Sequence, residues 1–236
     1  MKNFIISASI LIASLSSSFG QTIEEIAAKN IASNGGSEKI SAIKSIAMQN
    51  TMTTQFGDFE NKMVLLVGKA MRSDTKIMDN ELVQAYDGTT AWAIMPTMMG
   101  GSGSAEPLSA EMAKGLTSQI DPFPFFNYNE KGYKLELIGT EKIIGNDTYR
   151  VKIIFKDGAT TEFWLNHSDG QIVKVMATQN GQTGEIFYSN YKEFNGVSFP
   201  MTMTIDNPQA GKITIETKSI IINGSIDEES FKLPKK

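Results

Sequence analysis

The sequence has 236 residues, a formal net charge of −4 at pH 7, no cysteine and one histidine. This inventory excludes disulfides and thiolate chemistry, and without a basic run it makes nucleic acid and anionic bilayers poor partners. Thirteen methionines and thirteen phenylalanines favour apolar binding over catalysis, because methionine is unbranched and adapts to flexible ligands.

The N-terminus has the pattern of an export signal. Met1-Lys2 is a short cationic region, residues 4–15 are apolar apart from serines, and Ser18-Phe19-Gly20 fits a small-x-small cleavage site. The apolar run is short for a bilayer span. We therefore expect residues 1–20 to be a signal peptide.

The remaining residues, 21–236, match the size of one large β domain, and we expect a single domain. Position 21 is Gln21, whereas the acyl anchor of a bacterial lipoprotein requires a cysteine there. The sequence thus predicts an exported, soluble protein that is not acylated.

Two helices are expected at the start of this domain. Thr22-Ile23-Glu24-Glu25 is a capping-box pattern, and Asn34-Gly35-Gly36 is a helix stop. The apolar residues between them recur at close to helical spacing. A short second helix is expected after Ser37, with Ile40 and Ile43 facing inward.

From Ser45 the apolar period changes to two, which predicts a half-buried strand. Further strands are expected at residues 62–69, 70–78, 82–86, 90–95, 133–138, 149–155, 160–165, 171–178, 183–191, 197–205 and 212–222. Compact turn signals separate them, and Asp87-Gly88 is expected to form a type I′ hairpin turn. The predicted fold class is mainly β with few helices (α+β), a curled antiparallel meander with a concave face.

The least regular segment, residues 96–124, lies between the two sets of strands. A short helix is expected from Ser109, with Leu108, Met112, Leu116 and Ile120 on one face. We interpret the segment as a lid or plug over the concave face. A helix that permanently closes the core would show the same apolar stripe, so both interpretations stay open.

No catalytic pattern emerges from the sequence. His167 lies between Asn166 and Ser168-Asp169, but neighbours in a tight turn cannot adopt the geometry of a catalytic triad. We expect an exposed turn histidine. Asp227-Glu228-Glu229 lacks the spaced ligands and glycine of a calcium loop. We therefore predict no enzyme, no cofactor and no metal site.

The chain resembles the outer-membrane lipoprotein-sorting family of LolA-like periplasmic carriers. In the first half, the segments that carry the resemblance are Thr22-Ile23-Glu24-Glu25-Ile26, Gly35-Gly36, Ile43-Lys44-Ser45-Ile46 and Tyr86-Asp87-Gly88-Thr89-Thr90-Ala91-Trp92 with Pro96. In the second half, segments similar to members from Bacteroidetes-type envelopes are Tyr188-Ser189-Asn190-Tyr191, Asn195-Gly196-Val197-Ser198-Phe199-Pro200, Ile226-Asp227 and Phe231-Lys232-Leu233-Pro234. The order and spacing of these segments are more specific than any one of them.

The resemblance implies an unclosed half-barrel of antiparallel strands over helices, with an apolar cavity for the acyl chains of lipoproteins or lipids. It also implies a periplasmic location and membrane-bound loading and receiving proteins as partners. In this family, a basic residue followed by proline helps to hold the lid closed. The corresponding stretch here is Lys69-Ala70-Met71-Arg72, which lacks the proline, so Lys69 and Arg72 are the candidates for a lid latch.

The candidate ligand-binding residues are the large apolar side chains of the expected lid and inner sheet face. They are Met52, Phe56, Met63, Met71, Met78, Trp92, Met98, Met99, Met112, Leu116, Phe123, Phe126, Phe163, Met176 and Phe187. For each of them, a place in the permanent core is the alternative. Because Phe163 and Trp164 are neighbours in a strand, they should point to opposite faces, leaving one ring exposed unless a helix covers it.

The leading hypothesis is a soluble periplasmic carrier that delivers lipoproteins or lipids to the outer membrane. The alternative is an envelope sensor or protein-interaction module that uses the same fold without transport. A secreted hydrolase is a third alternative, because carboxylates distant in sequence can meet in a cleft.

Overall fold

The computed structural model describes residues 21–179, 182–207 and 211–235. The expected signal peptide, residues 1–20, lies outside the described residues. Two helices open the described chain, α1 (Ile23–Ser33) and α2 (Ser37–Ala42). The predicted capping box is confirmed, since the Thr22 side chain accepts from the Glu25 backbone and the Glu25 carboxylate accepts from the Thr22 backbone.

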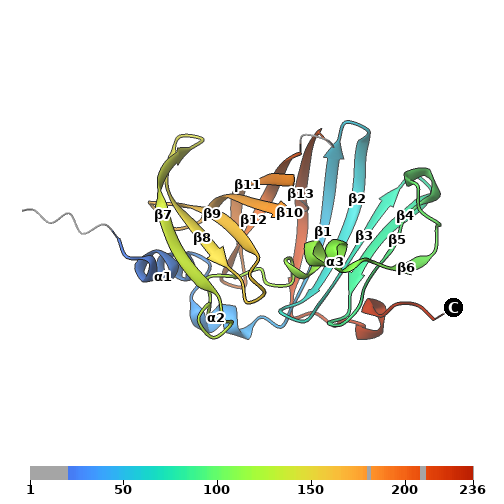
Figure 1. Ribbon diagram of the computed structural model, residues 1–236, viewed down its shortest axis with the longest axis horizontal. Helices are drawn as coiled ribbons and strands as arrows, with labels where there is room; N and C mark the ends of the chain where they lie inside the picture. The colour runs from blue at the N-terminus through green and yellow to red at the C-terminus, as the bar shows by residue number, and fades with distance from the viewer. Residues whose placement is uncertain (1–20, 180–181, 208–210, 236) are drawn as a thin grey trace, which may run out of the picture.

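The rest of the chain is dominated by strands (Figure 1). The first half contains β1 (Ser45–Thr54), β2 (Gly57–Leu66), β3 (Ala70–Ile77), β4 (Asn80–Tyr86), β5 (Ala91–Ile94), the 3-10 helix η1 (Thr97–Met99), β6 (Ala105–Pro107) and α3 (Ala110–Thr117). The second half contains β7 (Lys134–Ile143), β8 (Asn146–Ile154), β9 (Thr160–Asn166), β10 (Ile172–Gln179), β11 (Gln182–Phe194), β12 (Val197–Asn207), β13 (Gly211–Ile222) and η2 (Glu228–Phe231). The mainly β class is therefore confirmed.

Within the described ranges, the strands belong to one 13-stranded antiparallel sheet in the order β6-β5-β4-β3-β2-β1-β13-β12-β11-β10-β9-β8-β7. The sheet is open, with β6 and β7 as its two edges. The prediction of one continuous meander is wrong in one respect. Each half of the chain forms its own meander, and β1 pairs with β13 where the two halves meet.

This order forces residues 108–133 to cross from one edge of the sheet to the other. In Figure 1 the crossing segment runs over the face of the sheet and includes α3. The helix begins where the sequence predicted, because the Ser109 side chain accepts a hydrogen bond from the backbone N–H of Met112. We call the face that packs against α3 the inner face and the opposite face the outer face.

The Asp87-Gly88 hairpin forms, but its turn differs from the expected two-residue type I′ turn. Four residues separate β4 from β5. The Asp87 carboxylate accepts from the backbone N–H groups of Thr89 and Thr90, at 2.8 and 2.7 Å, and Gly88 adopts a φ of 97°. The aspartate thus shapes this turn through its side chain, and only glycine takes the positive φ.

Three groups of buried apolar residues fill the structure. The α3 cluster, beneath α2 and α3, consists of Ile40, Ile43, Ile46, Leu65, Met71, Ala91, Leu116, Phe123, Val197 and Phe199. The α1 cluster consists of Ile26, Ala27, Phe125, Val151, Ile153, Phe163, Leu165 and Val175. The outer cluster, on the outer face, consists of Val83, Ala85 and Trp92. Residues of the crossing segment enter both inner clusters, so this segment joins the two halves of the sheet.

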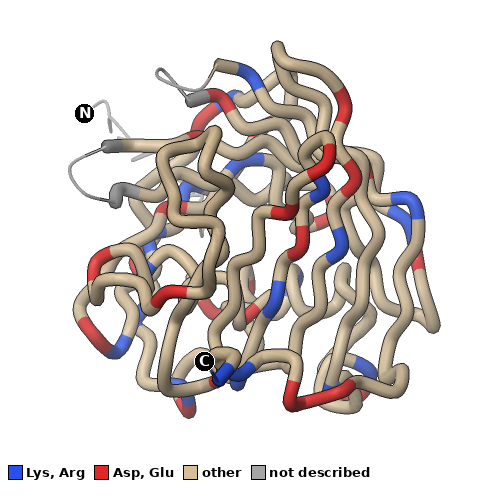
Figure 2. Tube along the Cα trace, turned by 90° about the vertical axis from the view of Figure 1, so that its right-hand side faces the viewer, with Lys and Arg blue, Asp and Glu red and all other residues tan. Residues whose placement is uncertain are grey.

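On the side of the molecule that carries β4 to β6, the charged residues that the structure describes do not form a patch of one sign. Figure 2 shows Lys and Arg interspersed with Asp and Glu along these strands. Several pairs are close, including Arg72 with Asp74 at 2.7 Å. The described residues on this side therefore form no extended basic surface that would attract a polyanion.

Candidate functional site

Apolar side chains continue along the inner face beyond the packed clusters. The register places Met203 of β12, Ile215 of β13, Met52 of β1 and Phe59 of β2 in one row across four adjacent strands. Strand alternation assigns this row to the inner face, because Ile46 on β1 and Leu65 on β2 have the same parity and belong to the α3 cluster. Ile205 and Ile213 form a second pair on the same face.

We call these six residues, Met52, Phe59, Met203, Ile205, Ile213 and Ile215, the inner apolar surface. Each is half-buried. In the part of the chain that the structure describes, none of the six belongs to or packs against the three buried clusters. The inner face therefore presents an apolar area that retains solvent contact in the middle of the sheet.

Tyr188 of β11 borders this surface, opposite Met203. Burial of its hydroxyl raises the pKa of Tyr188 to about 12. Near the β7 edge of the same half of the sheet, burial and the nearby Asp121 carboxylate raise the pKa of Tyr133 to about 12. Both phenols are therefore neutral at ordinary pH, and Tyr188 adds no charge to the inner face.

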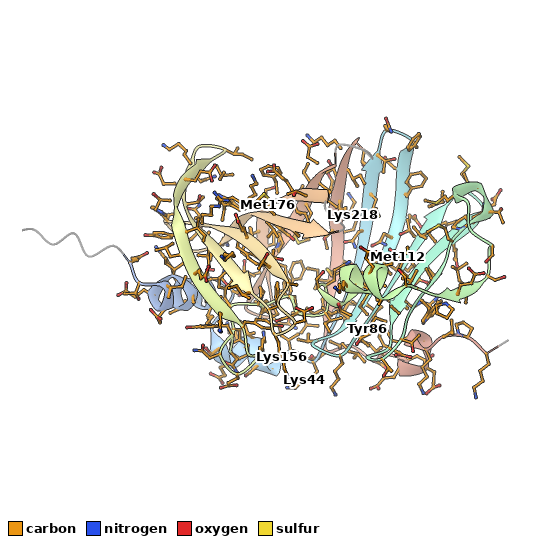
Figure 3. The ribbon with its side chains drawn as sticks, in the orientation of Figure 1. Lys44, Tyr86, Met112, Lys156, Met176 and Lys218 are labelled. Atoms are coloured by element: carbon orange, nitrogen blue, oxygen red, sulfur yellow. The ribbon has the colours of Figure 1, made fainter. Side chains whose placement is uncertain are left out.

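Helix α3 is fixed at both ends by backbone hydrogen bonds. The N–H of Leu108 donates to the carbonyl of Ala91 at 2.8 Å, and the N–H of Gly68 donates to the carbonyl of Ile120 at 2.8 Å. Leu116 is buried in the α3 cluster, whereas Met112, labelled in Figure 3, is 45% exposed. The stripe expected from the sequence is thus divided between the core and the surface.

The predicted ligand-binding residues are spread over several parts of the structure, and the first group lies on the inner face or packs beneath it. Met52 belongs to the inner apolar surface. Met63 is half-buried against the α3 cluster, as is Phe126 of the crossing segment. Met71, Leu116 and Phe123 are members of the α3 cluster, and Phe163 is a member of the α1 cluster. These four residues therefore lie in the buried core, which was the alternative to a ligand-binding role.

The other predicted residues lie away from the inner face. Trp92 is fully buried in the outer cluster. Met176 and Phe187 lie on the outer face, because they follow Val175 and Ile186, whose side chains are on the inner face. Met176 is labelled on β10 in Figure 3. Four more are exposed between strands, namely Phe56 and Met78 in turns and Met98 and Met99 in η1. Met112 completes the set on the exposed side of α3.

Five members of the inner apolar surface were missed in the sequence, namely Phe59, Met203, Ile205, Ile213 and Ile215. The alternation of Ile213, Thr214 and Ile215 did indicate one apolar face. The alternation could not indicate which strand pairs with β13. Only the β1–β13 register brings these isoleucines beside Met52.

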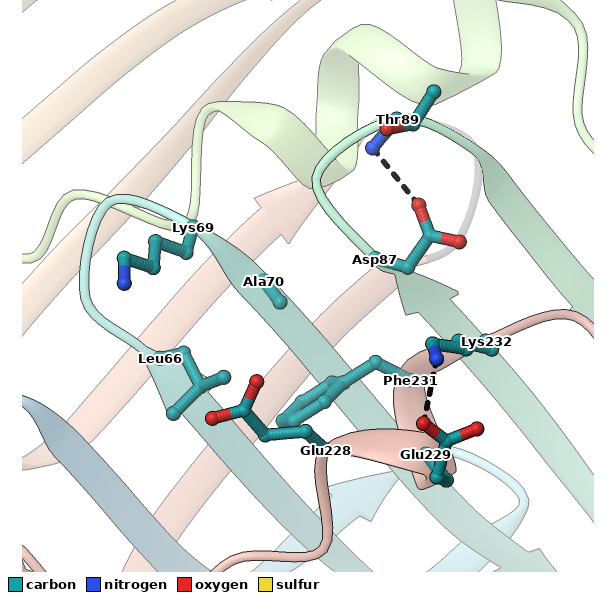
Figure 4. Close-up of a pocket in the computed structure, with 9 residues that line it drawn as sticks. All are labelled: Leu66, Lys69, Ala70, Asp87, Thr89, Glu228, Glu229, Phe231 and Lys232. Carbon is teal, nitrogen blue, oxygen red and sulfur yellow. Dashed lines mark hydrogen bonds and ion pairs between the residues drawn. The ribbon is translucent and has the colours of Figure 1, made fainter.

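The two candidate latch residues lie near the C-terminal segment. Arg72 points to the outer face, where it bonds Asp74 and donates to the carbonyl of Ser230 at 2.7 Å. Lys69 lines a pocket of about 330 Å³ between the β2–β3 turn, the β4–β5 turn and η2 (Figure 4). The remaining lining residues are Leu66, Ala70, Asp87, Thr89, Glu228, Glu229, Phe231 and Lys232. The hydrogen bond from this turn to the crossing segment comes from the Gly68 backbone.

His167 is not the exposed turn residue that the sequence suggested. It is half-buried, and its ring stacks on Tyr149 with centroids 3.7 Å apart and an interplanar angle of 24°. The Lys29 ammonium group of α1 donates to the His167 carbonyl. The turn before β10 therefore forms a docking surface for α1, while the histidine ring packs on Tyr149.

Trp164 and Phe163 do point to opposite faces, yet both are buried. The Trp164 ring lies on the outer face, where the Lys174 ammonium is 4.6 Å and the Arg150 guanidinium 5.2 Å from its centroid. Its indole N–H donates to the Glu141 carboxylate at 2.8 Å. Charged side chains cover this ring, and no helix is needed.

Among the described residues, no group of three or more acidic or histidine side chains is placed to hold a metal ion. No helix in this part of the chain combines the length and apolar character needed to cross a bilayer.

Solved structures with the same fold come from several bacteria. A LolA superfamily protein from Nitrosomonas europaea is 12% identical with a TM-score of 0.61, over 90% of this chain and 98% of that one. A domain assigned to outer-membrane lipoprotein sorting from Vibrio parahaemolyticus is 18% identical with a TM-score of 0.58, over 88% of this chain and 95% of that one. A DUF1329 family protein from Desulfovibrio piger is 12% identical with a TM-score of 0.60, over 89% and 97%.

At these identities the likeness establishes the fold, and the predicted resemblance to LolA-like proteins is confirmed at that level. No curated protein matches the sequence. A family model described as a domain of unknown function, DUF4412, matches residues 117–236, just over half of the 236 residues. The chain therefore belongs to the DUF4412 family and is built on the fold of the LolA superfamily.

Proposed function

We propose that this protein is a soluble periplasmic carrier that shelters acyl chains of lipoproteins or lipids and delivers them to the outer membrane. The observation that carries the proposal is the inner apolar surface, an apolar area on the curled face of an open sheet that the packed clusters leave accessible. Residues 1–20 would direct export. The open sheet would act as a half-barrel around the bound chain.

The energetics suit such a role. Each methylene removed from water contributes about 0.8 kcal/mol, so roughly a dozen methylenes contribute about 10 kcal/mol before ordering costs. Two methionines, Met52 and Met203, lie in the apolar row together with Ile215 and Phe59. Their flexible side chains can repack around different chains, which helps a carrier to bind and release its cargo.

The fold supports the same role. The Vibrio domain described above is assigned to outer-membrane lipoprotein sorting, and the Nitrosomonas protein is assigned to the LolA superfamily. Both cover nearly the whole of this chain. We infer that loading and receiving proteins in the two membranes would be the partners of the carrier.

The test compares two substitutions on β1 that face opposite sides of the sheet. Met52→Asp places a charge on the inner apolar surface, whereas Thr53→Asp places the same charge on the exposed outer side. We expect lipid occupancy to fall about tenfold or more in Met52→Asp, because an acyl chain would have to desolvate the carboxylate. Thr53→Asp should retain its lipid, and the two variants should have similar thermal stability.

Native mass spectrometry of each protein, purified from an envelope fraction, gives the measurement. Stoichiometric lipid or acylated peptide on the wild type supports carriage. Equal occupancy in Met52→Asp and Thr53→Asp would show that the inner apolar surface is not the binding site.

The alternative function, an envelope interaction module, is favoured by a different observation. Phe56, Met78 and Met98 are 77%, 69% and 58% exposed on the β1–β2 turn, the β3–β4 turn and η1. These connections follow alternate strands of one meander and so lie at the same end of the sheet. A lipid-free mass together with a stable protein partner would favour this function over carriage.

A further inference from the structure

A row of polar side chains crosses the inner face beside the inner apolar surface. It consists of Thr217 of β13, Asn50 of β1, Asn61 of β2 and Thr75 of β3, which are direct neighbours across four strands. Their exposed fractions are only 7%, 6%, 7% and 7%. We call this set the polar row. Buried polar side chains are uncommon in the middle of an apolar face, so the row requires an explanation.

Large apolar residues flank the row on both sides. Met48 and Met63 are paired on the side of the α3 cluster, and Met52 and Phe59 are paired on the side of the inner apolar surface. The order Met48, Asn50, Met52 on β1 is matched by Met63, Asn61, Phe59 on β2. An acyl chain lying on the inner apolar surface would therefore have the polar row at one end.

The hydrogen bonds fix the orientation of both amides. The Asn61 nitrogen donates to the hydroxyls of Ser73 and Thr75, at 2.8 and 3.0 Å, and lies 3.4 Å from the carbonyl of Asp74. Because a carbonyl can only accept, the nitrogen of Asn61 faces β3 and its oxygen faces β1. Asn50 donates to that oxygen at 2.9 Å.

In this arrangement one hydrogen-bond acceptor of the polar row stays unpaired. The side-chain oxygen of Asn50 is buried and accepts no hydrogen bond from any described residue. Its amide nitrogen is already committed to Asn61, so turning the amide would break the chain of bonds. A buried acceptor without a donor is unfavourable, and a ligand that supplies the donor gains affinity by pairing it.

We propose that the polar row recognises a neutral hydrogen-bond donor on the acyl ligand, a hydroxyl or an amide N–H, with the Asn50 oxygen as the acceptor. The inference rests on the proposed function and names its ligand class, which is acyl chains that carry such a donor. The four residues of the row are all uncharged, which suits a neutral donor better than an ammonium group. The flexible side chains of Met48, Met52 and Met63 can move to open a path to Asn50.

Three probes of equal chain length test the proposal. Palmitate has no donor, β-hydroxypalmitate carries a hydroxyl, and N-palmitoylglycine carries an amide N–H. We expect at least one donor probe to bind about tenfold more tightly than palmitate, as measured by isothermal titration. A preference for the hydroxyl indicates a hydroxylated acyl chain, and a preference for the amide indicates an amide-linked one.

Two variants locate the effect. The double variant Asn50→Leu/Asn61→Leu removes the free acceptor and also the Asn61 oxygen, which would otherwise lose its donor and become a second free acceptor. In this double variant the preference should fall to within about twofold while palmitate still binds. Ser73→Ala removes a hydroxyl of the same hydrogen-bond network but leaves the Asn50 oxygen in place. This control should keep the preference. If Asn50→Leu/Asn61→Leu does not fold, the preference of the wild type among the three probes decides the question.

The outcomes separate the two proposals. If the wild type binds none of the three probes, acyl carriage itself is overturned. If it binds all three equally, or if Asn50→Leu/Asn61→Leu keeps the preference, donor recognition by the polar row is overturned and acyl carriage stands.

Discussion

Trp92 shows how the surroundings of one side chain decide its role. Its ring lies in the outer cluster, and the indole N–H donates to the backbone carbonyl of Phe231 at 2.7 Å. The Arg72 guanidinium lies 5.8 Å from the ring and donates to the carbonyl of Ser230. Together, Trp92 and Arg72 hold the C-terminal segment against the outer face. The sequence had indicated a ligand-binding role for Trp92 and a lid-latch role for Arg72.

Trp92→Phe should lower the free energy of unfolding by about 1–3 kcal/mol, because the buried carbonyl of Phe231 loses its donor. Trp164→Phe is the matched control. Trp164 also donates one hydrogen bond, but its acceptor is the carboxylate of Glu141, an exposed residue that water can solvate. The loss in the control should therefore be smaller, and urea unfolding measures both. Equal losses would mean that the Phe231 carbonyl finds another donor.

At the level of elements, local sequence signals predicted most of the boundaries. The capping box of Thr22 and Glu25, and Ser109 before α3, satisfy backbone donors within one helical turn and need no distant partner. β7 is an exception, since it was expected at 133–138 and extends to Ile143. Gly139 lies where the register shifts, so the strand continues through a bulge that the sequence suggests only as a break.

The α1–α2 connection gives a prediction at this scale. Gly35 has a φ of 106°, and a Cβ there would lie 2.2 Å from the carbonyl oxygen of Gly196 in the β11–β12 turn. Gly36 has a φ of 88° but has nothing within 4 Å of its Cβ position. Gly36→Ala should cost about 1–2 kcal/mol from backbone strain alone.

Gly35→Ala should cost at least about 3 kcal/mol, because the strain is combined with a clash against backbone. Thermal unfolding of the two variants gives the comparison. If both lose the same stability, the contact between the helices and the β11–β12 turn is not tight in solution.

At the scale of the whole molecule, the crossing segment couples the two meanders. Phe123 packs in the α3 cluster, which contains Ile46 and Leu65 of the first meander, and its ring centroid lies 6.0 Å from that of Phe199 on β12. Phe125 packs in the α1 cluster of the second meander, with its ring centroid 5.4 Å from that of Phe163. Two residues of one short segment thus anchor both halves of the sheet. The β1–β13 pairing joins the same halves along the backbone.

Phe125→Ala should destabilise both halves together, by about 3–5 kcal/mol. Each meander holds one tryptophan, Trp92 on β5 and Trp164 on β9, so single-tryptophan variants report on each half. We expect the same shift of the urea midpoint from both reporters, and a smaller shift for the half-buried Phe126→Ala. A shift seen only by Trp164 would show that the halves unfold independently.

The candidate site shows where prediction from sequence ended. Met52 was identified because alternation assigns it to a face, but the partner strand β13 lies far along the chain. Trp92, Met176 and Phe187 were expected inside because they are large and apolar. Alternation along a strand does not say which of its two faces is the inner one. Phe187 lies on the outer face, where the Lys174 ammonium is 5.5 Å from its ring centroid.

The sequence by itself determined the helices, nearly all the strands and the mainly β class, because caps, turns and alternation act over a few residues. It also carried the resemblance to LolA-like proteins. Only the tertiary structure decided that β1 pairs with β13, that the crossing segment packs into both inner clusters, and which apolar residues remain accessible beside the polar row. These features depend on contacts between segments far apart in the chain, where the pairing of whole strands rather than local preference sets the outcome.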